Sequence, residues 1–259
     1  MSKYIISLLL FACLLSGFAQ ETAVVTKGKD SISYKQPYGL RVGIDLSKVA
    51  LSYFNEDYTG FEVVGDYRLS QNLYLAGELG REEKRQSEIL GNGILEGDIL
   101  LYDFTPSGNY LKLGVDLNTY DNWYGMNNSI YLGGRYAFST FKQTLNDYQL
   151  YDTNRYWNAD GFSSGNGELN GEYSGLNASW LEFLFGVKVE MFKNLYMGAS
   201  ARIMFLVSSK DSEVMPNLWI PGFTKVTDGS NFGVNYNYTL SYMIPLYKKA
   251  KKIKPEINP

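Results

Sequence analysis

The sequence predicts an all-β fold, an eight-stranded antiparallel up-and-down transmembrane β-barrel of the outer-membrane type. Eight segments after residue 37 alternate apolar and polar side chains with a period of two, the pattern of strands that have two different faces. The connections between them alternate between short and long, as in outer-membrane barrels with short periplasmic turns and longer extracellular loops. The 259 residues include 26 Gly, 22 Tyr and 14 Phe, which favours strands and turns over helices.

The predicted strands and connections follow directly from this alternation. The strands are predicted at residues 40–47, 61–68, 73–80, 111–118, 130–139, 181–190, 195–205 and 232–244. Short connections are predicted at 69–72, 119–128 and 191–194, and long ones at 48–60, 81–108, 141–178 and 208–231. Both termini of the barrel then lie on the short-turn side. Residues 98–104 either form an extra hairpin strand or extend the fourth strand, so the strand count is eight or ten.

The two ends of the chain have the character of a leader and a tail. Residues 1–19 are a predicted signal peptide, with Lys3, an apolar stretch and small residues before a cleavage site. Residues 20–37 are a predicted flexible periplasmic lead-in, and the barrel is expected to occupy residues 38–247. Residues 248–259 form a Lys-rich periplasmic tail, whose lysines either lie against anionic lipid or are solvated.

We expect the apolar faces to contact lipid and the polar faces to fill the lumen. The polar faces carry cations and carboxylates in nearly equal number, separated by small residues, which suits the narrow interior of an eight-stranded barrel. Because buried ions need partners, the sequence predicts a structural ion-pair network that plugs the lumen. Asp45 and Asp66 are expected to pair with Arg41 and Arg68. The predicted members are Arg41, Asp45, Glu62, Asp66, Arg68, Glu78, Lys112, Asp116, Arg135, Glu182, Lys188, Glu190 and Arg202.

Several classes of activity are disfavoured by composition. The sequence contains no His, and its single Cys, Cys13, lies in the predicted signal peptide. The usual proton carrier at neutral pH and the usual zinc ligands are therefore missing, and no phosphate-binding glycine loop precedes a helix. We expect no enzymatic activity, no cofactor and no metal site. With 24 basic and 27 acidic residues, the chain also lacks the charge expected of a nucleic-acid-binding protein.

The long connection at residues 141–178 is rich in Tyr, Trp, Asn and Gly. Long loops with rigid aromatic side chains can form adaptable binding surfaces, so this segment is a candidate site for an extracellular ligand. The interpretation we favour is that it extends the barrel strands above the membrane, with its aromatic side chains packed on one another.

Six motifs along the chain are typical of a known family. They are YGLRVGIDLS at 38–47, FEVVGDYR at 61–68, RYAFSTF at 135–141, WLEF at 180–183, IPGF at 220–223 and YTLSYMIP at 238–245. Over about residues 38–249 the chain resembles a domain-of-unknown-function family, number 6048, of small outer-membrane β-barrel proteins of Bacteroidota. The resemblance implies a barrel in the outer membrane. It implies no activity, because the family has no assigned catalytic or binding residues.

These observations predict a protein of the Gram-negative cell outer membrane, of unknown molecular activity, with a structural or surface-interaction role and a charge-plugged lumen. Its expected partners are outer-membrane lipid and, during insertion, the barrel-assembly machinery. Two alternatives stay open. One is a soluble lipocalin-like carrier of apolar ligands, in which the two faces of the sheet would be reversed. The other is a narrow, porin-like outer-membrane pore.

Overall fold

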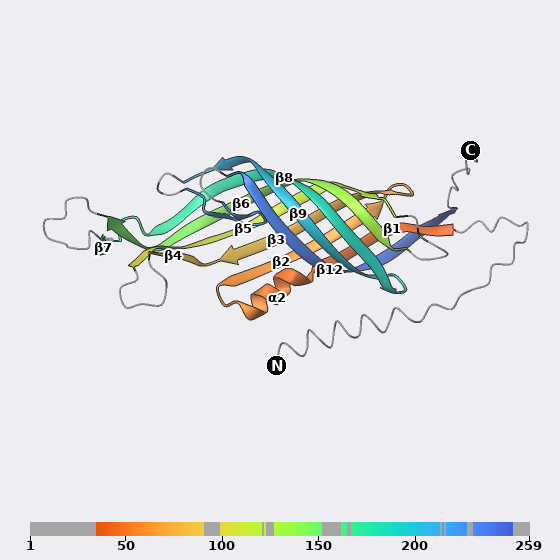
Figure 1. Cartoon of the computed structure of the whole chain (residues 1–259), viewed down its shortest axis with the longest axis horizontal. Coiled ribbons are helices and arrows are strands. Elements are labelled where there is room, and N and C mark those ends of the chain that lie inside the picture. Colours follow the sequence, from red (N-terminus) through yellow and green to blue (C-terminus); the bar gives the residue numbers. More distant parts are fainter. Residues whose placement is uncertain are drawn as a thin grey trace, which may run out of the picture. The chain divides into compact units, whose positions relative to one another are not determined.

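Eight antiparallel strands close a ring, and the predicted eight-stranded barrel fold is confirmed (Figure 1). β12 pairs with β1 from Asp45↔Thr239 to Lys35↔Ala250 and so closes the ring. The strands of the ring, in order, are β1 (Lys35–Asp45), β2 (Tyr58–Arg68), β3 (Leu73–Lys84), β5 (Ile99–Asn118), β6 (Ser129–Tyr151), β8 (Gly171–Phe192), β9 (Leu195–Lys210) and β12 (Phe232–Ala250). The computed structural model describes residues 35–90, 99–120, 122, 127–151, 162–164, 167–212, 214, 216–226 and 230–250.

The first and last strands reach beyond the predicted barrel limits. β1 begins at Lys35, inside the predicted lead-in, and β12 ends at Ala250, inside the predicted Lys-rich tail. Lys248 and Lys249 are therefore strand residues, paired with the start of β1. The predicted signal peptide and the rest of the lead-in and tail lie outside the described residues.

Much of the predicted long connections is strand. β5 starts at Ile99, β6 continues to Tyr151, and β8 already begins at Gly171. β4 (Gln86–Leu90) continues the line of β3 and pairs with the start of β5. Residues 99–104 thus extend the predicted fourth strand, and the ring keeps eight strands. The period-two pattern misses these extensions because they carry fewer apolar residues at alternate positions.

We call the two ends of the barrel the long-loop end and the short-turn end. The long-loop end carries β4, β7 (Phe162–Ser164) and the hairpin of β10 (Trp219–Ile220) and β11 (Thr224–Lys225). β4 and β7 project at the left of Figure 1, and β1 and β12 meet at the opposite end. The described residues at the short-turn end include the tight connections from β2 to β3 and from β8 to β9.

A helix occupies part of the barrel wall. Leu46 and Ser47, predicted as the end of the first strand, instead begin α2 (Leu46–Phe54), because Asp45 caps the helix by accepting a hydrogen bond from Ser47 N at 2.9 Å. β1 therefore stops at Asp45, whereas β2 and β12 continue past it towards the long-loop end, and α2 packs against both of them. Ser52 Oγ accepts a hydrogen bond from Gly60 N of β2 at 2.7 Å. No helix among the described residues is long and apolar enough to cross a membrane.

The apolar face of the sheet points outward and the charged face points into the lumen, as the sequence predicts. Outward-facing apolar side chains are widely exposed, for example Leu113 at 55 % and Phe183 at 58 %. Inward-facing charged side chains are buried, with Glu182 at 1 % and Arg202 at 3 % exposure. The arrangement is the reverse of a water-soluble barrel, in which apolar residues are turned inward.

Candidate functional site: a filled lumen and a groove at its long-loop end

Nine ion-paired side chains fill part of the lumen, and we call them the charged belt. Arg202 binds Glu78 at 2.5 Å and Glu182 at 3.1 Å. None of the nine side chains is more than 6 % exposed, so the pairs are shielded from water. The members are Lys48, Glu62, Glu78, Glu82, Lys112, Asp116, Arg135, Glu182 and Arg202.

Lys112 and Arg135 connect the remaining carboxylates of the belt. Lys112 Nζ lies 3.0 Å from Glu182 and 3.9 Å from Glu62. Arg135 binds Asp116 at 2.7 Å and lies 3.6 Å from Glu78. Each of these two cations thus lies between two carboxylates, so removing either one would leave two buried carboxylates with one cation partner fewer.

A second cluster joins two cations through one carboxylate. Asp66 accepts hydrogen bonds from Arg41 at 2.7 Å and from Lys188 at 2.6 Å. The belt has four cations and five carboxylates, a net charge of −1, and this cluster has two cations and one carboxylate, a net charge of +1. The twelve groups therefore balance, which limits the cost of holding them away from water.

Three of the predicted network members form no ion pair with any residue that the structure describes. Asp45 caps α2 and accepts a hydrogen bond from Asn237 Nδ2 at 2.6 Å. Arg68 donates to main-chain carbonyls, among them Gln71 O at 2.7 Å, and its guanidinium lies over the Tyr38 ring at 4.6 Å. Glu190 accepts a hydrogen bond from Asn194 N at 3.0 Å. We expected Asp45 and Arg68 each to pair with an opposite charge, and this expectation is wrong. Both residues lie at strand ends, where Asp45 binds Ser47 and Asn237 and Arg68 binds main-chain carbonyls.

Two members of the belt come from segments predicted as long connections. Lys48 projects from α2, where its ammonium binds Glu82 and lies 4.0 Å from Glu62. Glu82 lies two residues beyond the predicted end of the third strand, in β3. Glu82 was predictable, since Glu78, Gly80 and Glu82 continue one inward face. Lys48 was not, because no periodic apolar stripe marks so short a helix.

The hairpin β10–β11 closes the lumen at the long-loop end. It places Ile220 and Phe223 against Trp180, whose ring meets Phe223 edge-on with ring centroids 5.6 Å apart. We call the fully or nearly buried cluster around the hairpin the apolar plug. Its members are Tyr110, Ala137, Phe141, Leu176, Ala178, Trp180, Met204, Ile220 and Phe223.

Hydrogen bonds attach the plug to the charged belt. Gly222 N donates to Glu82 Oε2 at 2.6 Å, and Tyr110 OH donates to Glu62 Oε2 at 2.6 Å. Gly222 has φ of +82°, and a Cβ there would lie 2.5 Å from the Tyr110 ring, so only glycine fits this turn. Trp180 Nε1 donates to Glu182 Oε1 at 2.7 Å. The polar tips of the plug thus complete the solvation of the belt carboxylates.

A small cavity lies inside the ring. A cavity of about 30 Å³ lies among Arg41, Asp66, Glu78, Arg135 and Lys188. That volume holds about one or two water molecules. A solute could pass this level only if the ion pairs separated.

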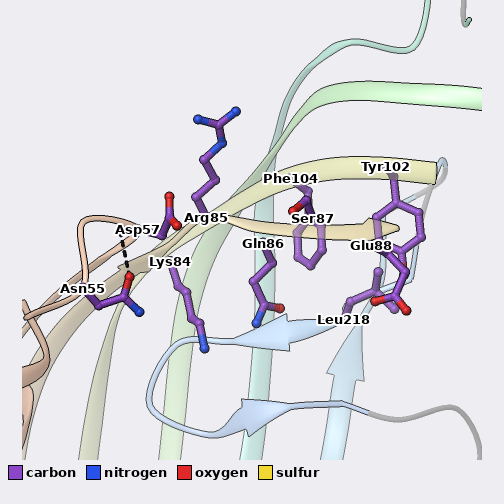
Figure 2. Close-up of a pocket in the computed structure, with 10 residues that line it drawn as sticks. All are labelled: Asn55, Asp57, Lys84, Arg85, Gln86, Ser87, Glu88, Tyr102, Phe104 and Leu218. Carbon is purple, nitrogen blue, oxygen red and sulfur yellow. Dashed lines mark hydrogen bonds between the residues drawn. The ribbon is translucent and has the colours of Figure 1, made fainter. Parts of the chain in front are cut away.

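A larger groove lies outside the plug, at the long-loop end. It has a volume of about 250 Å³ and mixes charged, amide and aromatic side chains (Figure 2). Beside it, Arg85 binds Asp103 at 2.5 Å, and this hydrogen bond, with the attraction of the Asp103 charge, raises the pKa of Arg85. The groove is lined by Asn55, Asp57, Lys84, Arg85, Gln86, Ser87, Glu88, Tyr102, Phe104 and Leu218.

The predicted loop 141–178 is largely strand where it is described. Residues 141–151 belong to β6 and residues 171–178 to β8. Tyr148 packs with Phe104 and Leu145 in a second apolar cluster, which Tyr173 joins from β8. Residues 152–161 and 165–166 lie outside the described residues. The described part therefore agrees with the interpretation we favour, in which this segment extends the barrel strands and its aromatic rings pack together.

The fold and lumen define a class of protein, a small closed β-barrel with an apolar exterior and an interior filled by its own side chains. The model of the family described as "Domain of unknown function (DUF6048)" matches residues 1–249, and the chain belongs to this family. The predicted family membership is thus confirmed. No curated protein matches the sequence.

Two solved structures from Acinetobacter baumannii are similar to this chain. CarO2 has a TM-score of 0.35 and 11 % sequence identity, and the match covers 82 % of this chain and 100 % of that chain. CarO has a TM-score of 0.35 and 10 % identity, and the match covers 81 % of this chain and 98 % of that chain. At these values we draw no functional argument from the likeness.

Proposed function

We propose that the protein is an integral barrel of the Gram-negative outer membrane that conducts no solutes and has a structural or surface-interaction role. The observation that carries the proposal is the inverted solvation of the sheet. Leu113 and Phe183 are more than half exposed on the outside, while Arg202 and Glu182 are buried within. A wide band of exposed apolar side chains needs lipid to cover it, and a closed ring leaves no strand edge unsatisfied in lipid.

The orientation follows from the lengths of the connections. In outer-membrane barrels the short turns face the periplasm and the longer hairpins face outward. The long-loop end, with β4, β7 and the groove, would then face the cell exterior. Its tall hairpins supply the proposed surface for interactions, while outer-membrane lipid and the barrel-assembly machinery are the partners in insertion.

The contents of the lumen support a non-conducting barrel. The ion pairs of the charged belt and the apolar plug occupy successive parts of the interior, and the cavity between the ions holds about one or two waters. Against a lipocalin-like carrier, the described interior offers charged side chains where such a carrier needs an apolar cavity.

We also propose that the protein is not an enzyme. The chain has no His, and the belt carboxylates are engaged by Lys or Arg side chains. A carboxylate held in this way is a poor general base, because taking up a proton would break its ion pair.

The location is tested by expressing the full chain in a Gram-negative host and fractionating the cells. We expect the protein in the outer membrane, resistant to extraction with urea or carbonate, and migrating faster on gels before boiling than after. Planar-bilayer recording of the purified barrel should show no steady conductance. Recovery of the folded protein from the soluble periplasm would overturn the membrane location, and regular single-channel steps would overturn the closed lumen.

A further inference from the structure

Among the described residues, no strand pairs with β4 on the side away from β5. β2 pairs with β3 as far as Tyr58↔Lys84, and one more hydrogen bond, from Arg85 N to Asp57 O at 2.8 Å, ends this ladder. The chain then continues into β4, which pairs with β5 on its other side. In antiparallel sheets the main-chain groups of successive residues point to opposite sides. Ser87, two residues after Arg85, therefore directs its N–H and C=O away from β5, to the side where β2 has ended.

The residue that could have filled this position is used elsewhere. The register of Asp57 with Arg85 would place Asn55 opposite Ser87 if β2 continued. Asn55 instead ends α2, where its N–H donates to Leu51 O at 2.9 Å. The 250 Å³ groove lies at this position, lined by Asn55 and Asp57 on one side and by residues 84–88 on the other (Figure 2).

We propose that the groove binds an extended peptide segment of a partner protein as an added strand beside β4. The inference rests on the proposed surface-interaction function and names the kind of partner. A free strand edge next to a groove is the geometry of strand addition, in which main-chain hydrogen bonds supply affinity and alternate side chains supply specificity. Ser87 provides both the donor and the acceptor that an incoming strand needs.

The floor of the groove selects the side chains of the peptide. Leu218 and Tyr102 are half-buried and present apolar and aromatic surface, and Phe104, which is 2 % exposed, lies on the same strand as Tyr102. Alternate side chains of an added strand point to one face, so the peptide should carry apolar residues at every second position. The rim carries charges of both signs, Lys84 and Glu88, so it favours no strongly charged partner.

A sugar is the competing ligand chemistry, because aromatic and amide groups also suit a carbohydrate. Strand addition is favoured here because the position beside β4 continues the line of β2 at strand spacing and faces the main chain of Ser87. The affinity for a sugar would depend on stacking against the ring of Tyr102 and hardly at all on the Ser87 N–H.

The test measures peptide binding by the full chain, folded in detergent micelles and shown to be heat-modifiable on gels. The probes are fluorescent heptapeptides in which Thr alternates with Val, Leu, Phe or Tyr, each with a partner peptide methylated at the alternate main-chain nitrogens that would face β4. We expect at least one plain peptide to bind about tenfold more tightly than its methylated partner, since each main-chain hydrogen bond contributes about 0.5–1.5 kcal/mol.

Two variants place the effect at the proposed edge. Ser87→Pro removes the N–H that faces the groove without removing a β4–β5 hydrogen bond, so affinity should fall about tenfold while the barrel stays heat-modifiable. Ser87→Ala keeps the main chain and should bind within about twofold of the original chain. Binding should also slow hydrogen exchange at the Ser87 amide.

The contrary outcomes are distinct. No binding by any peptide, or equal binding of plain and methylated peptides, overturns strand addition. Competition by methyl glucoside together with no effect of Ser87→Pro assigns the groove to carbohydrate. Each of these results leaves a heat-modifiable barrel in the outer membrane, so the proposed location would survive. Recovery of the protein in the soluble periplasm would instead contradict the proposed outer-membrane location.

Discussion

The charged belt and the apolar plug fill the same lumen by opposite means. The belt consists mostly of side chains that project from the ring strands themselves, with Arg202 and Lys112 held between carboxylates. The plug depends on a hairpin that folds back into the barrel and presents Ile220 and Phe223. The first filling can be lost only if the barrel itself deforms. The part of the second filling that Ile220 and Phe223 supply can be lost if the hairpin undocks.

This difference predicts that the belt is the rigid part of the lumen and that the hairpin is the part that can move. Breaking one ion pair in the belt leaves a buried charge, which is strongly unfavourable. Undocking the hairpin exposes apolar surface and breaks the hydrogen bond from Gly222 N to Glu82, but it leaves the ring strands paired. We expect substitutions in the belt to affect folding of the whole barrel and substitutions in the hairpin to affect mainly the long-loop end.

The largest expected effect is that of Arg202→Met. It leaves Glu78 and Glu182 with fewer cation partners in a buried site, so the free energy of unfolding should fall by about 3–5 kcal/mol. Urea titration of the detergent-folded barrel measures it. The matched control is Lys142→Met, whose ion pair with Glu172 at 2.7 Å is half exposed and should contribute less than about 1 kcal/mol. Equal losses in the two variants would contradict a shielded belt.

Leu113→Arg extends the comparison to the outside of the wall. Leu113 follows Lys112 on β5. Leu113 faces outward, whereas Lys112 is buried in the lumen. An arginine on the lipid face should destabilise the barrel by about 2–4 kcal/mol, whereas Leu113→Met should cost less than about 1.5 kcal/mol. Folding yield into lipid vesicles, followed by the gel shift on heating, measures both. Efficient insertion of the arginine variant would argue against lipid contact at this position.

Gly222→Ala tests the plug alone. The added Cβ would lie 2.5 Å from the Tyr110 ring and the residue has a positive φ, so hairpin docking should weaken by about 1–3 kcal/mol. Limited proteolysis should then cut the hairpin faster, while the urea midpoint of the ring changes little. A large fall in that midpoint would mean that plug and belt unfold as one unit.

Asp45→Ala should have the smallest effect of the four. It removes the N-cap of α2 and the contact with Asn237, at a cost of about 1–2 kcal/mol. Because α2 carries Lys48 into the belt, hydrogen exchange should quicken at the start of α2 before it changes in β9. Asp45→Ser retains a capping oxygen and should recover most of the loss.

The ring and its two faces could be predicted because period-two alternation encodes both of them locally. Leu111, Leu113 and Val115 alternate with Lys112, Gly114 and Asp116, and only a strand gives such residues opposite environments. Most members of the ion-pair network could be predicted, but most of their pairings could not. Asp66 meets Arg41 on the neighbouring strand, yet it also meets Lys188 from across the lumen, a contact that no local pattern records.

The helix and the plug escaped prediction for a different physical reason. α2 replaces strand at Leu46, where the Asp45 side chain caps the helix. The hairpin residues Ile220 to Phe223 were noted only as a family motif, because their burial depends on docking against Trp180 and Glu82, residues far away in the chain. Tertiary contacts of this kind leave no periodic signal in the sequence.

The helix in the wall also bears on how the cylinder closes. Where β1 has ended, β2 and β12 share no main-chain ladder, and side chains such as Ser52 substitute for it. The seam between the first and last strands therefore runs from Lys35↔Ala250 to Asp45↔Thr239, with one register shift between Tyr38 and Gly39, and is interrupted towards the long-loop end. We expect closure during biogenesis to zip from the terminal end of that seam, and breathing of the finished wall to concentrate at its interrupted half.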